Sequence, residues 1–571
     1  MDLEGSPVPL TTRRTGRALA AALVAAALGV GPAVAASAAI TPGSGPVSVA
    51  VVVPITARAT TSGLISAEDL ERYTGPFGIL TRQLDAVAGT PAAIALDPMI
   101  PASIRVLGAS APVSASQWLA RLQATSNEVF LLAYGDADLV AGARTGTLAQ
   151  LTPSGFDFAL DPDDFSAVNE PAPTPDPTAT PTPDPEAPPP FPTTDDVLAW
   201  DTPLPRIAWP DATIAESDLP AFAAVGYEHV IVPSSSVGEP ATPLVQLDGV
   251  RGIVSDTQLS GLVANAASAS SPTVRGTALD AFETALANRT ASTPGRGIVV
   301  TVDRGWTTTG TGLADVLARL SSTSSAGSAT LSDVLATAPV PARLGAGVDT
   351  ADRDEVFTTL ASDAVAESAF ASVLSEPAAL LDPRRLERIA LYSLAWRTDE
   401  DGWTDAVREF RDRSTELRSS VHLEHGSDVA LLARNVDLKV TVSNALPFPV
   451  TVVVTADPRG PILRARETRE LTIEPQSTGT ARIPVEAIAN GEVTVTTSIA
   501  SPTGVPIDSG VARVTVRAEW EGIGTLVVVI MLALVFAAGL VRLIVVRRRG
   551  RRPDADETEE AQDAPAEGTD G

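Results

Sequence analysis

Six aspartates occupy positions where side chains could carry out chemistry, each at or just after the end of an apolar run. They are Asp97, Asp136, Asp138, Asp211, Asp256 and Asp303. In a parallel α/β barrel the carboxyl ends of the strands meet at one face, and active sites lie at that face. Two carboxylates across it could act as acid and nucleophile in glycoside hydrolysis.

Two tryptophans stand beside these acids and could stack on a sugar ring. Trp209 is close to Asp211, and Trp306 is close to Asp303. The candidate catalytic residues are therefore Asp136, Asp211 and Asp303, and the candidate ligand-binding residues are Asp97, Asp136, Asp138, Trp209, Asp303 and Trp306.

A structural interpretation competes with the chemical one, because Asp is strongly preferred at the start of a helix. Asp97-Pro98 and Asp256-Thr257 both have the sequence of a helix start. Asp136 and Asp138 could likewise cap a helix from Leu139. For any single Asp the cap is the favoured interpretation, so only the whole set suggests a cleft that faces a sugar.

The two interpretations differ in the expected pKa of the carboxyls. A catalytic acid would have a raised pKa, whereas a carboxylate that accepts backbone N–H bonds would have a lowered one. We predict the second outcome for Asp97 and leave Asp136 and Asp303 open as residues that contact a sugar.

Metal and cofactor chemistry is not expected. The chain has no cysteine and three histidines: His229 stands alone, and His422 and His425 lie near Glu424, away from the expected barrel face. A metal site also needs a third ligand and a supporting shell. No glycine-rich phosphate loop follows a strand. With 41 basic and 69 acidic side chains the net charge is −28, which argues against binding of nucleic acid.

The elements that must position these residues are seven short apolar runs, several of them separated by helical stretches. The runs are Val47–Pro54, Ala92–Leu96, Val129–Tyr134, Arg206–Pro210, His229–Pro233, Gly252–Asp256 and Gly297–Asp303. Continuous apolar strands alternating with helices predict a parallel sheet. We predict one α/β barrel-like domain over 45–350 with a proline-rich insertion at 171–192; two small α/β domains joined by that segment are the alternative.

Two further regions of different character follow. Residues 351–418 have helical spacing with mixed charges and predict a helical subdomain. Residues 420–518 have short alternating runs separated by turn residues, which predicts an immunoglobulin-like sandwich without a disulfide.

The two ends indicate a membrane-anchored protein of the cell envelope. Residues 1–38 have the charged, apolar and small-residue order of a secretory signal peptide. The segment Ile523 to Val546 is long and apolar enough to cross a membrane, and we expect the cell membrane to be its partner. Arginines dominate the start of 547–571, so this end is predicted to be cytoplasmic, with a disordered acidic tail, and the large N-terminal part extracytoplasmic.

Several short motifs resemble an uncharacterised actinobacterial family of secreted single-pass envelope proteins, often encoded beside the lipid II flippase. The motifs are Ala95-Leu96-Asp97-Pro98, Leu132-Ala133-Tyr134-Gly135-Asp136-Ala137-Asp138-Leu139, Ala208-Trp209-Pro210, Val254-Ser255-Asp256, Ser393-Leu394-Ala395-Trp396-Arg397 and Asn444-Ala445-Leu446-Pro447-Phe448-Pro449-Val450. The resemblance covers nearly the whole mature chain and implies an envelope location without an established activity.

A second resemblance is at the level of fold, to the seven-stranded barrels of polysaccharide deacetylases and certain glycoside hydrolases. It implies metal ligands for a deacetylase, which the histidine positions do not supply. For a hydrolase it implies a Glu after the fourth strand, where this chain has Trp209-Pro210-Asp211.

Two functional hypotheses follow. The first is a non-catalytic, membrane-anchored envelope protein that binds a cell-wall glycan or a partner protein. The alternative is an exported glycosidase-type hydrolase that acts on an envelope polysaccharide through its strand-end carboxylates. We favour the first, because the histidines are misplaced and no acid pair is secure.

Overall fold

The computed structural model describes residues 47–165, 191–517 and 521–549, except positions 239, 241, 293–296, 305, 307–311, 323–325, 349, 425–428 and 466–467. Four predicted features lie wholly or mostly outside the described residues: the signal peptide, the proline-rich insertion, His425 and the acidic tail.

A curled parallel sheet of seven strands confirms the predicted α/β architecture. The strands are β1 (Val47–Ile55), β2 (Ala93–Leu96), β3 (Val129–Leu131), β4 (Ile207–Ala208), β5 (His229–Pro233), β7 (Arg251–Ser255) and β8 (Ile298–Thr301). Their parallel pairings run in the order β4-β5-β7-β8-β1-β2-β3. The strands before and after the proline-rich insertion therefore belong to one sheet.

The two edges of this sheet are strands that follow one another in the chain. β3 and β4 form no ladder with each other. Thr202, just before β4, nevertheless donates its hydroxyl to the carbonyl of Val129 in β3. The sheet thus curls into an incomplete barrel, and we call the gap between β3 and β4 the seam.

Strand β1 illustrates why the strands are apolar throughout. Ala50 and Val52 pack in the core inside the curled sheet. Val49, Val51 and Val53 pack in the larger core between the sheet and its helices. Both faces of the strand are buried, so the sequence shows a continuous apolar run instead of alternation.

Most of the helices between the strands cover the outer face of the sheet and contribute to the larger core. These helices are α1 (Ala67–Thr74), α2 (Ile79–Val87), α3 (Met99–Val106), α4 (Val113–Gln123), α5 (Leu139–Arg144), α7 (Thr194–Leu198), α8 (Leu219–Ala224), α9 (Ser234–Val237), α10 (Thr257–Ser268), α11 (Pro272–Ser292) and α12 (Gly312–Ser322). The short helix α6 (Pro162–Phe165) buries no residue, and α13 (Leu331–Leu335) packs Leu331 and Val334 into the core inside the curled sheet.

Three short strands extend the sheet beyond the seven predicted. β6 (Leu244–Gln246) is antiparallel to β7, β10 (Val340–Pro341) pairs with β6, and β9 (Ala326–Ala329) pairs with the start of β1. Strand β9 has the sequence Ala-Gly-Ser-Ala, which lacks the β-branched and aromatic residues that mark strands. It forms because the edge of β1 offers it a ladder.

The helical region contains three helices, as the spacing predicts: α14 (Ala351–Phe370), α15 (Ala378–Leu391) and α16 (Glu400–Ser419). A buried ion pair joins two of them, with Arg384 Nη2 lying 2.6 Å from Glu367 Oε1. Arg384 also packs its guanidinium on the ring of Phe410 in α16, at 3.8 Å.

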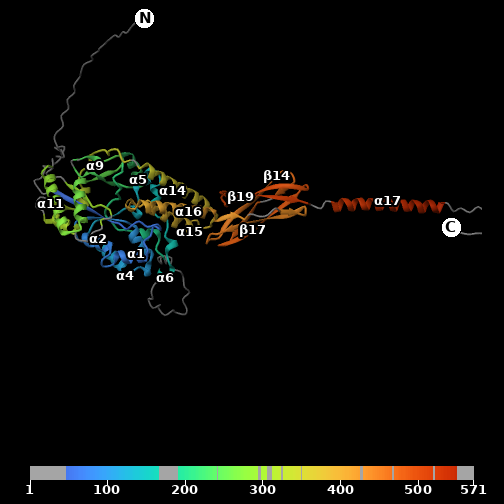
Figure 1. Cartoon of the computed structure of the whole chain (residues 1–571), viewed down its shortest axis with the longest axis horizontal. Coiled ribbons are helices and arrows are strands. Elements are labelled where there is room, and N and C mark those ends of the chain that lie inside the picture. The colour runs from blue at the N-terminus through green and yellow to red at the C-terminus, as the bar shows by residue number, and fades with distance from the viewer. Residues whose placement is uncertain are drawn as a thin grey trace, which may run out of the picture. The chain divides into compact units, whose positions relative to one another are not determined.

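Two β-sheets that share one apolar core follow the helices (Figure 1). One has the order β11-β13-β17-β15 and the other β12-β19-β18-β14-β16. The strands are β11 (Val421–Leu423), β12 (Val429–Leu431), β13 (Asn435–Asn444), β14 (Val450–Arg459), β15 (Leu463–Ala465), β16 (Arg469–Ile473), β17 (Ser477–Ala487), β18 (Gly491–Ala500) and β19 (Pro506–Val516). Buried and exposed residues alternate along the longer strands, which is the pattern that predicts a sandwich.

Asn444 explains why the Asn-x-Leu-Pro-x-Pro-Val run is a turn. Its side-chain amide donates to the carbonyls of Phe448, at 2.8 Å, and Glu474, at 3.0 Å, and its oxygen accepts from the N–H of Leu446, at 3.0 Å. Asn444 is 1% exposed, so water cannot replace these bonds.

We expect Asn444→Ala to destabilise the sandwich by about 1–3 kcal/mol, because buried carbonyl and N–H groups lose their partner. Chemical unfolding followed by far-ultraviolet circular dichroism measures the change. Asn435→Ala, at an exposed position on the same strand, is the matched control. Equal effects of the two substitutions would show that the Asn444 bonds contribute nothing.

The last described element is α17 (Glu521–Arg549). Its stretch Leu526–Arg548 is long and apolar enough to cross a membrane, with a mean hydropathy of 2.8.

Candidate functional site

The acids that follow β2, β3 and β4 gather with three arginines from elsewhere in the chain. Asp97 follows β2, Asp136 and Asp138 follow β3, and Asp211 follows β4. The arginines are Arg144, Arg304 and Arg397, which we call the seam arginines.

The turn after β3 uses two consecutive residues in the left-handed backbone region, Gly135 at φ 65° and Asp136 at φ 48°. Gly and Asp are among the residues that adopt this region most readily. The turn directs the N–H of Gly135 to Asp97 Oδ1, at 2.9 Å. The same oxygen accepts the N–H of Met99 at the start of α3, also at 2.9 Å.

Asp97 therefore accepts the backbone bonds expected of it, but the expected direction of its pKa was wrong. Burial raises the pKa of Asp97 to about 8, the backbone bonds oppose this only in part, and the nearby charge of Asp136 raises it further. The side chain is 1% exposed. Removal from water outweighs two neutral hydrogen bonds for a group this deep.

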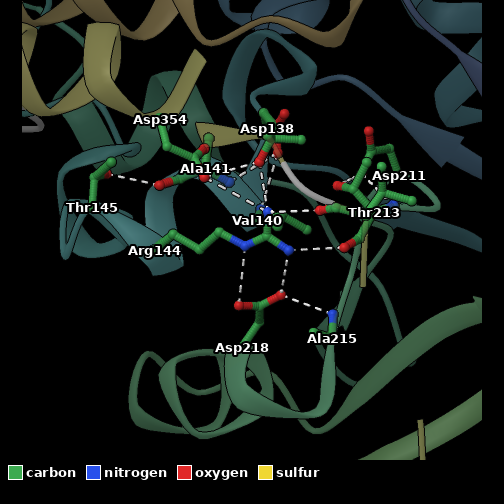
Figure 2. A network of polar contacts seen from close by, with 12 residues as sticks. Asp138, Val140, Ala141, Arg144, Thr145, Asp211, Thr213, Ala215, Asp218 and Asp354 are labelled. Carbon is green, nitrogen blue, oxygen red and sulfur yellow. Dashed lines mark hydrogen bonds and ion pairs between the residues drawn. The ribbon is translucent and has the colours of Figure 1, made fainter. Parts of the chain in front are cut away.

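Asp138 caps helix α5, as predicted, by accepting the N–H groups of Val140 and Ala141 at 3.0 Å each (Figure 2). Its second oxygen lies 2.8 Å from Arg397 Nη2. The same nitrogen lies 2.5 Å from Asp211 Oδ2. Arg397 thus joins the acid after β3 to the acid after β4, across the seam.

Arg304 makes a second connection across the seam. Its Nε donates to Asp136 Oδ2 at 2.6 Å, and its Nη2 donates to the carbonyl of Trp209. The guanidinium also lies 4.9 Å from the centre of the Trp209 ring. Asp136 is therefore an ion-pair partner and caps no helix, and one face of Trp209 is already occupied by a cation.

Arg144, at the end of α5, makes the third connection (Figure 2). Its Nη2 donates to the carbonyl of Thr213 at 2.9 Å and lies 3.3 Å from Asp218 Oδ2. Its Nη1 donates to Thr350 Oγ1 at 2.6 Å. Asp218 and Thr213 follow β4, so this bond network also joins the two sides of the seam.

The seam arginines replace the missing ladder between β3 and β4. Arg304 and Arg397 each bind the polypeptide after β3 and the polypeptide after β4, through carboxylates, carbonyls or both. Arg144 belongs to helix α5, after β3, and binds the polypeptide after β4. Burial raises the pKa of Asp136 and of Asp138, and the charge of Asp211 raises that of Asp138 further, while the arginines act in the opposite direction. Asp136, Asp138 and Asp211 are thus engaged in ion pairs with these arginines.

The structure separates the remaining candidates. Asp303 is exposed and lies outside the network that the described residues form. Trp306 is 5% exposed and donates its indole N–H to the carbonyl of Pro54 at 2.9 Å, so it belongs to the core and offers no face to a sugar. Asp256 caps α10, as predicted, through the N–H of Leu259 at 2.9 Å.

No candidate metal centre is present among the described residues, in which no three His, Asp or Glu side chains gather suitably. His229 is buried in β5, and burial lowers its pKa.

The seam arginines are the residues that sequence reasoning missed as part of the site. Arg304 directly follows Asp303, and Arg397 ends one of the motifs quoted above. The position of Arg304 beside a strand-end acid was therefore a signal that an arginine belongs to the site. The acidic partners were not visible locally, because Asp136 lies 168 residues from Arg304 in sequence and Asp138 lies 259 residues from Arg397.

Comparisons with known proteins locate the chain in a family. The model described as "Family of unknown function (DUF6049)" matches residues 20–555. No curated protein matches the chain.

Solved structures give low-identity likenesses. An α-amylase from Thermotoga maritima matches with a TM-score of 0.42 at 11% identity, covering 65% of this chain and 93% of the amylase. Native α-2-macroglobulin from Escherichia coli matches with a TM-score of 0.15 at 18% identity, covering 17% of this chain and 7% of that protein. A human PapD-like domain matches with a TM-score of 0.14 at 7% identity, covering 18% and 85%.

Proposed function

This chain belongs to DUF6049, a family of unknown function, and we propose that it is a non-catalytic, membrane-anchored protein of the cell envelope. Its curled-sheet domain binds a cell-wall glycan or an envelope partner outside the membrane. The observation that carries the proposal is the sharing of Arg397 by Asp138 and Asp211, which engages the acids of two strand ends in one ion-pair network.

The burial of the acids supports the absence of catalysis. Hydrolysis of a glycoside needs two carboxyls that both touch the substrate. Asp97, Asp136 and Asp138 are each 4% exposed or less, and Asp211 is paired with Arg397. Asp303 is the one exposed carboxylate among the strand-end candidates, and a single acid suits a contact with a sugar hydroxyl better than hydrolysis.

The distribution of charge along α17 supports the anchoring. Arg542, Arg547 and Arg548 lie toward its C-terminal end, and an arginine-rich end stays on the cytoplasmic side. The large N-terminal part is then extracytoplasmic.

Truncation after residue 517 tests the anchor. We expect the truncated protein to appear in the culture medium and the full chain to stay in the membrane pellet after an alkaline carbonate wash, because α17 supplies the only long apolar helix among the described residues. Retention of the truncated protein in washed membranes would contradict the anchoring.

Co-sedimentation with insoluble cell-wall material tests the binding. We expect the truncated protein to pellet with the wall and to be released by soluble wall fragments. Asp303→Asn should weaken this binding several-fold, because a charged hydrogen bond becomes a neutral one. Asp401→Asn, an exposed acid in α16, is the control. Failure to pellet, together with failure to capture any envelope protein after cross-linking, would exclude the proposal.

A further inference from the structure

The seam contains a groove that the functional site does not use. It has a volume of about 620 Å³ and a mostly apolar lining. Phe130 and Leu131 of β3 and Leu132 just after it form one side, and Leu204, Pro205 and Arg206 before β4 form the other. We call it the seam groove. Leu139 of α5, Ala224 at the end of α8 and Val225 just after it contribute further apolar surface. Its size lies within the range of small-molecule sites.

One charged side chain lies on this lining. Arg206 is exposed at the rim, where its Nη1 donates to the carbonyl of Val225 at 2.6 Å and its guanidinium lies 4.7 Å from the ring centre of Tyr227. These contacts fix the guanidinium in place. Among the described residues no carboxylate lies within ion-pair distance of Arg206. Arg206 differs in this from the seam arginines, each of which pairs with an aspartate.

The lining therefore has two parts with different chemistry. The body of the groove favours an aliphatic chain, because burial of each methylene is favourable. No acid or amide side chain among the described residues lines the groove, so a bound chain would strip no such group of its water. The rim favours an anion, because Arg206 has donors and a positive charge that no described acid neutralises. We infer that the seam groove binds a single-chain anionic amphiphile of the fatty-acid type, with its chain in the groove and its head on Arg206.

This inference does not rest on the proposed function, because the seam groove and the acids beside it are different surfaces. A glycan or a partner protein could bind elsewhere on the domain whether or not the groove is filled.

Photolabelling of the full chain in membranes tests the inference. The probe is hexadecanoate with a diazirine on its chain, and labelled peptides are located by mass spectrometry. We expect label on peptides that contain residues 130–134 and 204–206, above the level of other surface peptides. Label on α17, which contacts the bilayer, serves as the internal standard.

Competitors and variants define the two halves of the site. Unlabelled hexadecanoate should remove the groove label. Dodecanoate, with four fewer methylenes, should need roughly a hundredfold higher concentration. Hexadecanol, which lacks the anionic head, should compete poorly.

Ala224→Trp, which fills the groove, should reduce the label at least tenfold, and Arg206→Gln should reduce it several-fold. Arg343→Gln, at a side chain 86% exposed, is the control and should change nothing. Ala149→Trp, at the exposed rim, provides a second filling variant if Ala224→Trp unfolds the protein. Groove label that no filling variant lowers, or label no higher than on other surface peptides, would overturn the inference.

Discussion

Arg397→Gln is expected to destabilise the α/β region by about 3 kcal/mol, because two acids with little access to water lose their shared cation. The side chains of Asp138 and Asp211 are 5% and 16% exposed. Removal of one partner of a buried ion pair typically costs about 3–5 kcal/mol of stability. Arg397 itself is 34% exposed, so we expect a loss at the lower end of that range. Arg408→Gln, which breaks an exposed pair with Asp405, should cost well under 1 kcal/mol and is the matched control.

Tryptophan fluorescence during denaturant unfolding measures this effect selectively. Six of the seven tryptophans lie before residue 420, and none lies in the sandwich. A triple variant that adds Asp138→Asn and Asp211→Asn to Arg397→Gln should recover much of the loss, since no unpaired charge remains. If Arg397→Gln proved no more harmful than Arg408→Gln, the seam arginines would not connect the two sheet edges.

Asp97→Asn is expected to stabilise the protein at alkaline pH and to flatten its dependence on pH. The folded-state pKa of Asp97, about 8, lies above the ordinary value of about 4. The folded protein therefore binds a proton that the unfolded chain has lost. The stability due to this group is fully present below pH 4, falls as pH rises, and is lost above pH 8.

The size of this effect follows from the width of the pH window. A shift of one pKa unit corresponds to about 1.4 kcal/mol, so the native protein should lose several kcal/mol between pH 4 and pH 8 through Asp97 alone. Asn keeps the oxygen that accepts from Met99 and Gly135 and carries no charge. Denaturant unfolding at several pH values should show Asp97→Asn losing less stability than the native protein, with Asp401→Asn parallel to the native protein. Parallel curves for Asp97→Asn would refute the buried, protonated state.

The strands of the curled sheet were predictable because local sequence specifies them. Val47–Ile55 is buried on both faces and has no polar residue that would fit a surface strand except Ser48. Asp138 as a helix cap was equally local, because the cap bonds run to residues two and three positions away.

The connections across the seam were not predictable, because they depend on residues that the fold brings together from distant segments. Arg304 and Arg397 meet Asp136 and Asp138 only after the sheet has curled and the helical region has packed. Trp306 is an example of a local pattern that misled, because its proximity to Asp303 in sequence suggested that its ring stacks on a sugar. Its indole N–H instead finds the carbonyl of Pro54, and a buried tryptophan with a satisfied N–H is a core residue.

Release of reducing ends from purified envelope polysaccharide tests the central claim most directly. The claim is that the strand-end acids perform no hydrolysis. The native protein truncated after residue 517 should release no more reducing sugar than its Asp211→Asn and Asp303→Asn variants, each checked to be folded by tryptophan fluorescence. Release by the native protein that either substitution abolishes would contradict the account and establish a glycosidase.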